Sequence, residues 1–192
     1  MRHYTVERIV SHLRLYLRTY FSALALGAVV LSQAEAATRE EMRRLDAAYP
    51  AGSVVLCHSE VAGSEMFPQP VSVTTRGRVV ESAADRRVFD VSVTWLTKGS
   101  TSGLTLNFRM RQRSDEEGQY SLIDPDSMRV SWPGVGSEAV KTVLQGFRAR
   151  MTDGEKFEPY SHTTIARFPG YIVLTPGEAP QFCSKEPPRE DE

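Results

Sequence analysis

Motifs for catalysis and for cofactor binding are missing from this chain of 192 residues. The nucleophile motif G-x-S-x-G does not occur, and no two histidines have the H-x-x-x-H or H-E-x-x-H spacing of a metal site. Residues 134–139 match the dinucleotide pattern G-x-G-x-x-A, but no parallel strand with an acidic end follows them. We interpret them as a turn before a capped helix. The sequence therefore predicts neither a cofactor nor a metal ion, and it leaves enzymatic activity uncertain while leaning against it.

The chain also lacks a block of like charges and a large net charge. Charged residues make up 24% of the chain, and the formal net charge is -1. Aromatic side chains do not alternate with the arginines, so nothing favours nucleic-acid binding. The hydrophobic fraction of 41% suits one globular domain rather than a disordered chain.

Residues 1–36 have the pattern of a secretory signal peptide. Basic side chains outnumber acidic ones in residues 1–19, an apolar stretch follows at residues 20–31, and Ala34 and Ala36 form the A-x-A cleavage pattern before Ala37. The apolar stretch is shorter than the roughly 20 residues of a membrane span. We therefore expect cleavage and a periplasmic protein with no stable membrane span. The alternatives are secretion, or a membrane anchor if the signal is retained.

Cysteine is rare, and its two positions are informative. Cys57 and Cys183 lie near the two ends of the mature chain, where an even pair in an oxidising compartment predicts a disulfide. In the loop-entropy model, closing a loop of about 100 residues contributes about 4.7 kcal/mol. Two buried thiols are the alternative. A nucleophilic Cys57 is disfavoured because the adjacent His58 would point to the opposite face of a strand.

Hydrophobic periodicity predicts a single α+β domain over residues 37–183, built mostly of antiparallel sheet, with a charged and disordered tail at residues 184–192. Helices are predicted at residues 38–49 and 137–151, with Thr38 and Ser137 as their N-caps. We expect the second helix to pack its apolar stripe on the sheet.

Strands are predicted at residues 54–60, 71–75, 78–82, 119–123, 128–132, 162–168 and 171–175. The turns between neighbouring strands are assigned to Arg76-Gly77, to residues 124–127 and to Pro169-Gly170. The clearest element is a hairpin within residues 87–113. Its alternation suits a register that places Trp95 opposite Leu106 and Asp90 opposite Arg111.

Two sets of side chains are candidates for binding a partner. Arg109, Arg111 and Arg113 share one strand face and would form a positive stripe for an acidic partner. The alternative is a solvated face whose arginines pair with nearby acids. Phe67 and Trp132 are loop aromatics that would anchor a partner or pack back on the domain.

These patterns favour an exported, non-enzymatic domain that binds another protein. Inhibitors, immunity proteins against a periplasmic toxin and accessory subunits of an envelope complex belong to this class. The alternative is an envelope hydrolase that uses His58 or His162 with a nearby acid. A small-molecule carrier would need a cavity between helix and sheet. The oligomeric state does not follow from the sequence.

The exported chain is expected to begin at Ala37 and to contain no free thiol. Intact-mass measurement without reductant checks both points, because a disulfide removes the two thiol hydrogens from the mass of residues 37–192. A chain that begins well before Ala37, or thiols that react with an alkylating reagent after denaturation, would contradict this prediction.

Overall fold

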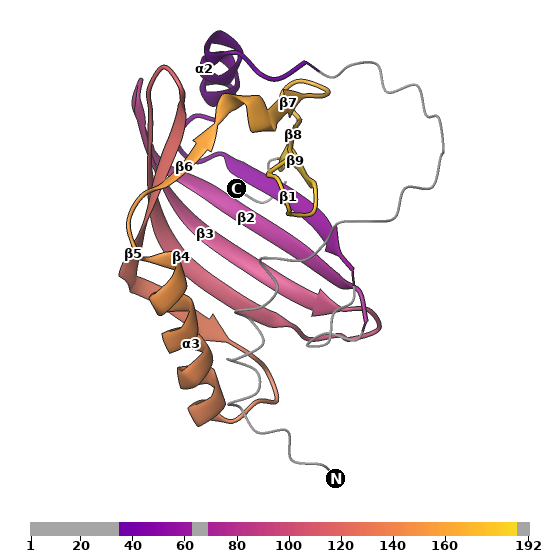
Figure 1. The fold of residues 1–192 in the computed structure, drawn as a ribbon. Helices are drawn as coiled ribbons and strands as arrows, with labels where there is room; N and C mark the ends of the chain where they lie inside the picture. The colour runs from indigo at the N-terminus through magenta and orange to yellow at the C-terminus, as the bar shows by residue number, and fades with distance from the viewer. Residues whose placement is uncertain (1–34, 63–68, 188–192) are drawn as a thin grey trace.

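A curled antiparallel sheet forms the body of the protein (Figure 1). The structure is a computed structural model that describes residues 35–62 and 69–187. Within these residues the sheet has nine strands in the order β6-β5-β4-β3-β2-β1-β9-β8-β7. The elements are α2 (Arg39–Ala47), β1 (Val54–Val61), β2 (Val71–Ser82), β3 (Arg86–Thr97), β4 (Leu104–Ser114), β5 (Gly118–Ser131), α3 (Ser137–Met151), β6 (Lys156–Pro159), η1 (Tyr160–His162), β7 (Thr163–Ile165), β8 (Tyr171–Val173) and β9 (Gln181–Lys185). The predicted α+β domain dominated by antiparallel sheet is confirmed.

The sheet comes close to a closed barrel because its two edge strands are neighbours in the sequence. β6 and β7 lie at opposite edges, yet only the short 3-10 turn η1 separates them. The inner face carries the core, in which Val79, Leu106 and Met128 are fully buried. The other face of each strand points away from this core.

Helix α2 closes one end of the core and begins as predicted. Thr38 caps it: Glu41 N donates to Thr38 Oγ1 at 3.3 Å, and Thr38 N donates to Glu41 Oε2 at 2.8 Å. This reciprocal capping box satisfies amide groups that the helix itself leaves free. Met42 and Leu45 are buried on the side that faces the sheet.

A buried ion pair ties α2 to β3. The guanidinium of Arg87 donates to Asp46 Oδ1 at 2.6 Å and to the carbonyl oxygen of Tyr49 at 2.6 Å. Arg87 is only 7% exposed and its contact with Tyr49 is buried, whereas the side chain of Asp46 is 25% exposed. The guanidinium of Arg87 thereby binds both a carboxylate of α2 and a backbone carbonyl just after the helix.

Helix α3 has the predicted bounds, but its N-cap differs. Gly136 occupies the cap position with no side-chain hydrogen bond, and Ser137 is the first helical residue. Phe147 stacks on Trp95 of β3 with ring centroids 5.5 Å apart. Leu144 and Met151 also contact the core, although no residue of α3 is buried.

The predicted disulfide between Cys57 and Cys183 is confirmed. The two residues are direct partners in the antiparallel pairing of β1 with β9. They are 8% and 6% exposed and belong to the hydrophobic core. The covalent link therefore joins the first strand to the last from inside the domain.

The predicted turn at Arg76-Gly77 is wrong, because β2 runs unbroken from Val71 to Ser82. Gly77 pairs with Val55 on one side and with Val91 on the other. Pairing on both sides holds its backbone extended. A glycine inside a central strand thus gave a false turn signal.

The predicted turn at residues 124–127 is a bulge inside the single strand β5. Its turn chemistry is present: Asp124 Oδ1 accepts from Asp126 N at 3.0 Å, and Ser127 Oγ donates to Asp124 O at 2.6 Å. Ser127 Oγ also accepts from Arg109 N at 2.7 Å, which keeps β4 attached through the bulge. The bend therefore interrupts the ladder without reversing the chain.

Arginine side chains bind backbone carbonyls at this bulge. Arg129 donates to the carbonyl oxygens of Asp126 and Met128 at 2.6 and 2.8 Å. Arg148 of α3 donates to the carbonyl oxygen of Pro125 at 3.2 Å. These carbonyls lie beyond the segment of β5 that pairs with β6.

The hairpin of β3 and β4 is confirmed, but its predicted register is wrong by two residues. Trp95 pairs with Leu104 instead of Leu106, and Asp90 pairs with Arg109 instead of Arg111. A slip of two leaves every side chain on its predicted face, so alternation does not distinguish the two registers. Gly103 permits the observed one, because a Cβ at this position would clash with the carbonyl of Trp95.

The C-terminal strands are shorter than the sequence predicts. β7 and β8 pair on either side of Pro169-Gly170, as expected. β9 was not predicted, and it includes Ser184 and Lys185, which the sequence assigned to the charged tail. Glu186 follows and pairs with Arg76 at 2.6 Å.

The Arg87→Leu variant is expected to lose about 3 kcal/mol of unfolding free energy, the lower end of the range for a broken buried pair. It leaves the Asp46 carboxylate, which is 25% exposed, and the buried carbonyl of Tyr49 without their partner. Urea denaturation with the disulfide intact measures this loss. The matched control is Arg109→Leu, whose partner Asp90 is half exposed, and its expected cost is at most about 1 kcal/mol. Equal losses of unfolding free energy in the two variants would contradict the larger contribution assigned to the Arg87–Asp46 pair.

Candidate protein-binding face

The side of the sheet that points away from the core carries a set of charged and apolar residues on β2 to β6, here called the outer face. Strand register aligns these residues in three rows across the sheet. The rows are Arg78, Asp90, Arg109, Asp124; then Glu81, Val88, Arg111, Leu122; then Arg86, Arg113, Tyr120, Phe157. The predicted stripe of Arg109, Arg111 and Arg113 thus runs along β4 through all three rows.

Arg109 is held by Asp90. Its Nε donates to Asp90 Oδ1 at 2.9 Å, and its terminal nitrogen lies 3.4 Å from Asp90 Oδ2. The hydrogen bond to Asp90 raises the pKa of the Arg109 guanidinium above its usual value. The sequence predicted Asp90 as the partner of Arg111, and the change of register transfers it to Arg109.

Arg113 is held more completely. Two of its nitrogens bind Glu155 in a fork, with Nε 3.0 Å from Oε1 and a terminal nitrogen 2.8 Å from Oε2. These hydrogen bonds lower the pKa of the Glu155 carboxyl. The guanidinium also lies over the ring of Tyr120, 3.7 Å from its centroid. Both contacts fix the orientation of Arg113.

Arg111 lies between these two arginines and differs from both. Its side chain is exposed, and among residues 35–62 and 69–187 no hydrogen bond or ion pair holds its guanidinium. Its neighbours across the strands are Val88 and Leu122. The middle arginine of the stripe is thus a free cation between two aliphatic side chains.

The apolar residues of the outer face were not among the predicted site residues. Leu122 and Phe157 are 38% and 44% exposed, and the ring of Tyr120 packs on Phe157 with centroids 4.8 Å apart. Tyr120 and Leu122 lie two residues apart in a strand that the sequence did predict. Their alternation could have indicated that both side chains lie on one face of the sheet. Phe157 lies on β6, which the sequence did not predict.

Trp132, one of the two predicted aromatic anchors, is not among the outer-face residues. Trp132 is half-buried in the turn after β5, where its carbonyl accepts from Val135 N at 3.2 Å. Phe67 lies outside the described residues. Among the described residues, the aromatic side chains of the three outer-face rows are those of Tyr120 and Phe157.

The two histidines in the described residues have separate partners. His58 Nδ1 lies 3.1 Å from Thr74 Oγ1 on an exposed part of β1. His162 Nδ1 lies 2.6 Å from Glu158 Oε1, an atom that also accepts from Thr175 Oγ1 at 3.0 Å. Within the described part of the chain, no cluster of three or more His, Cys, Asp or Glu side chains is placed to hold a metal ion.

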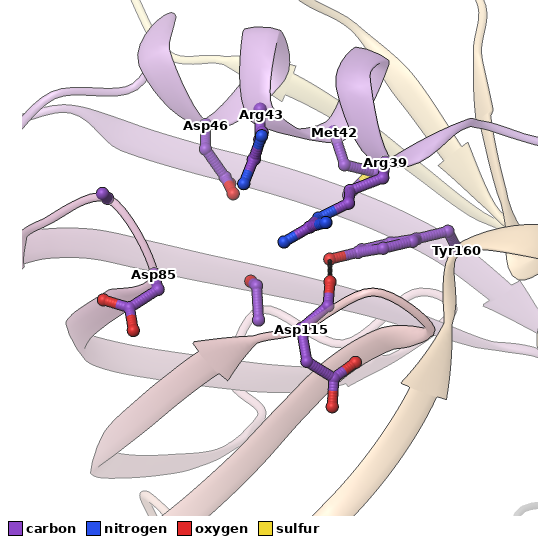
Figure 2. Close-up of a pocket in the computed structure, with 9 residues that line it drawn as sticks. Arg39, Met42, Arg43, Asp46, Asp85, Asp115 and Tyr160 are labelled. Atoms are coloured by element: carbon purple, nitrogen blue, oxygen red, sulfur yellow. Dashed lines mark hydrogen bonds between the residues drawn. The ribbon is translucent and has the colours of Figure 1, made fainter.

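Figure 2 shows a small polar pocket between α2 and the turn that joins β4 to β5. Its volume is about 30 Å³, whereas pockets for drug-sized ligands have volumes of about 300–1,000 Å³. Arg39, Arg43, Asp46, Asp85 and Asp115 line it. Tyr160 donates to the carbonyl oxygen of Asp115 at 2.8 Å along one side. This pocket is therefore too small for a drug-sized organic ligand.

Comparison with known proteins gives no assignment, since no protein-family model matches the chain and no curated protein matches it either. In the described residues, no helix is both long enough and apolar enough to cross a membrane. The functional conclusion therefore depends on the residues of the outer face and their contacts.

Proposed function

We propose that this protein is an exported, non-enzymatic domain that binds another protein through its outer face. The observation that carries the proposal is Arg111, an exposed cation without a partner among the described residues, set between Val88 and Leu122 and beside an aromatic pair. Arginine and tyrosine are enriched among the residues that dominate binding energy in protein interfaces.

The scaffold suits recognition of this kind because its binding residues lie on paired strands rather than on loops. Strand pairing and the Cys57–Cys183 disulfide hold the backbone before a partner arrives. Binding then costs less conformational entropy than it would on a flexible segment. In this proposal α3 packs its apolar stripe on the inner face and leaves the outer face to the partner.

The partner is a protein of the compartment that receives the exported chain, which we propose to be the periplasm after removal of residues 1–36. The domain would act there as an inhibitor, as an immunity protein that neutralises a toxin, or as an accessory subunit of an envelope complex. All three roles require a preformed surface and no chemical step.

The second candidate function is an envelope hydrolase, and one contact favours it. The 2.6 Å hydrogen bond between His162 and Glu158 is the pairing that a general base and its orienting acid would make. The hydroxyl of Thr175 donates to the same carboxylate, so it supports the acid and does not face the histidine as a nucleophile. The outer face has no part in this alternative.

The Phe157→Ser variant is expected to lose at least about tenfold in affinity for the partner, because it removes an exposed aromatic side chain from the proposed contact. The affinity is measured with tagged mature protein and a partner purified from native envelope extract. Phe182→Ser is the matched control, since Phe182 is 58% exposed on β9, on the other side of β1 from the outer-face strands, and its affinity should not change. Equal losses, or recovery of no stoichiometric protein partner by the wild type, would contradict the proposal.

His162→Ala is expected to leave partner binding unchanged, because His162 lies on η1 and not among the outer-face residues. His58→Ala serves as the control. We also expect no turnover of chromogenic ester, peptide or glycoside substrates by the wild type. Turnover that His162→Ala abolishes and His58→Ala preserves would establish the hydrolase instead.

A further inference from the structure

We propose that Arg111 is the anchor of the outer face and that it binds a carboxylate on the surface of an acidic partner protein. The inference rests on the proposed function and makes it more specific. It assigns the attractive charge to one residue of the stripe, and it names the chemical group that this residue receives.

The internal contacts of the stripe select Arg111. Asp90 already neutralises Arg109, and Glu155 already binds Arg113 in a fork. An incoming carboxylate would have to displace these acids to reach either guanidinium. Arg111 needs no displacement, and all the hydrogen-bond donors of its guanidinium are available.

A second available cation lies close to Arg111. Arg86 is 80% exposed, and its nearest acid, Asp85, is 4.0 Å away. In the register of β3 with β4, Arg86 lies opposite Arg113, and Val88 lies opposite Arg111. Arg86 and Arg111 are therefore diagonal neighbours. Residues in this diagonal relation lie about 7–8 Å apart, so one acidic side chain, or two adjacent ones, can contact both arginines.

The apolar neighbours strengthen the proposed contact. Val88 and Leu122 flank Arg111 directly, and Tyr120 with Phe157 lies in the next row. A partner that covers these side chains removes water from around the guanidinium. An arginine–carboxylate pair gains strength when it is bidentate and shielded from water in this way.

The distribution of charge on the face selects a protein over a polyanion. Asp90 and Asp124 alternate with Arg78 and Arg109 in the first row, and Glu81 lies in the same row as Arg111. A nucleic acid or an anionic membrane would meet these acids as repulsive charges. A folded protein with its own mixed charges can place a single carboxylate at Arg111 and avoid them.

Site-specific photo-crosslinking identifies the occupant. A photoreactive phenylalanine replaces Leu122 in the mature chain, with the same replacement at Phe182 as the control. The crosslinked partner residue is mapped by mass spectrometry after irradiation in native envelope extract. From position 122 we expect crosslinks to an acidic surface of another protein. From position 182 we expect no crosslinks to that partner.

Charge reversal then tests the contact itself on the purified pair. Arg111→Glu is expected to weaken binding at least about thirtyfold, the loss expected for a dominant interface residue. Arg111→Lys should give an intermediate loss, because an ammonium does not form the bidentate contact. Arg167→Glu makes the same charge change on an exposed turn and should leave binding within about twofold of the wild type. Reversal of the mapped partner acid to arginine should restore binding to Arg111→Glu.

Each other outcome overturns the inference. Crosslinks from Leu122 to nucleic acid, lipid or a second copy of this chain would identify a different occupant. The wild type and Arg111→Glu could also bind with equal affinity and melt at the same temperature. That result would show that Arg111 is not the anchor, and it would not contradict the proposed binding function. Failure of the wild type to bind any protein would instead remove the proposed function.

Discussion

Antiparallel pairing between β1 and β9 is the contact on which the rest of this structure depends. In the strand order, this pairing connects β2–β6 on one side to β7 and β8 on the other. The disulfide between Cys57 and Cys183 lies within it. The pairing brings together segments 126 residues apart. Since the chain also passes directly from β6 to β7 through η1, the curled sheet is held at both places where it would otherwise open.

This closure determines what the outer face can do. A curved sheet held at its seam presents the side chains of β2–β6 at fixed spacings, and those spacings decide which acid neutralises which arginine. Asp90 reaches Arg109 and Glu155 reaches Arg113, whereas Arg111 is left to solvent. The position of the free positive charge on the outer face thus depends on the ion pairs that neutralise Arg109 and Arg113.

Features controlled by neighbouring residues were predictable from the sequence, and features controlled by distant pairing were not. The capping box at Thr38 and the apolar stripe of α3 are local, and both helices have nearly the expected bounds. The hairpin register was wrong because a slip of two residues preserves the alternation of faces. That slip moved Asp90 from Arg111 to Arg109 and changed which arginine is free. Phe157 was missed because β6 has four residues and depends on β5 for its strand structure.

The arginines at the β5 bulge protect the sheet against unwanted strand addition. Beyond the end of β6, β5 would present open carbonyl groups along the rim of the sheet, the usual template for aggregation. Arg129 and Arg148 occupy three of these carbonyls. Another strand would have to displace these guanidinium groups before it could pair here. This part of β5 is therefore a poor template for the addition of another strand.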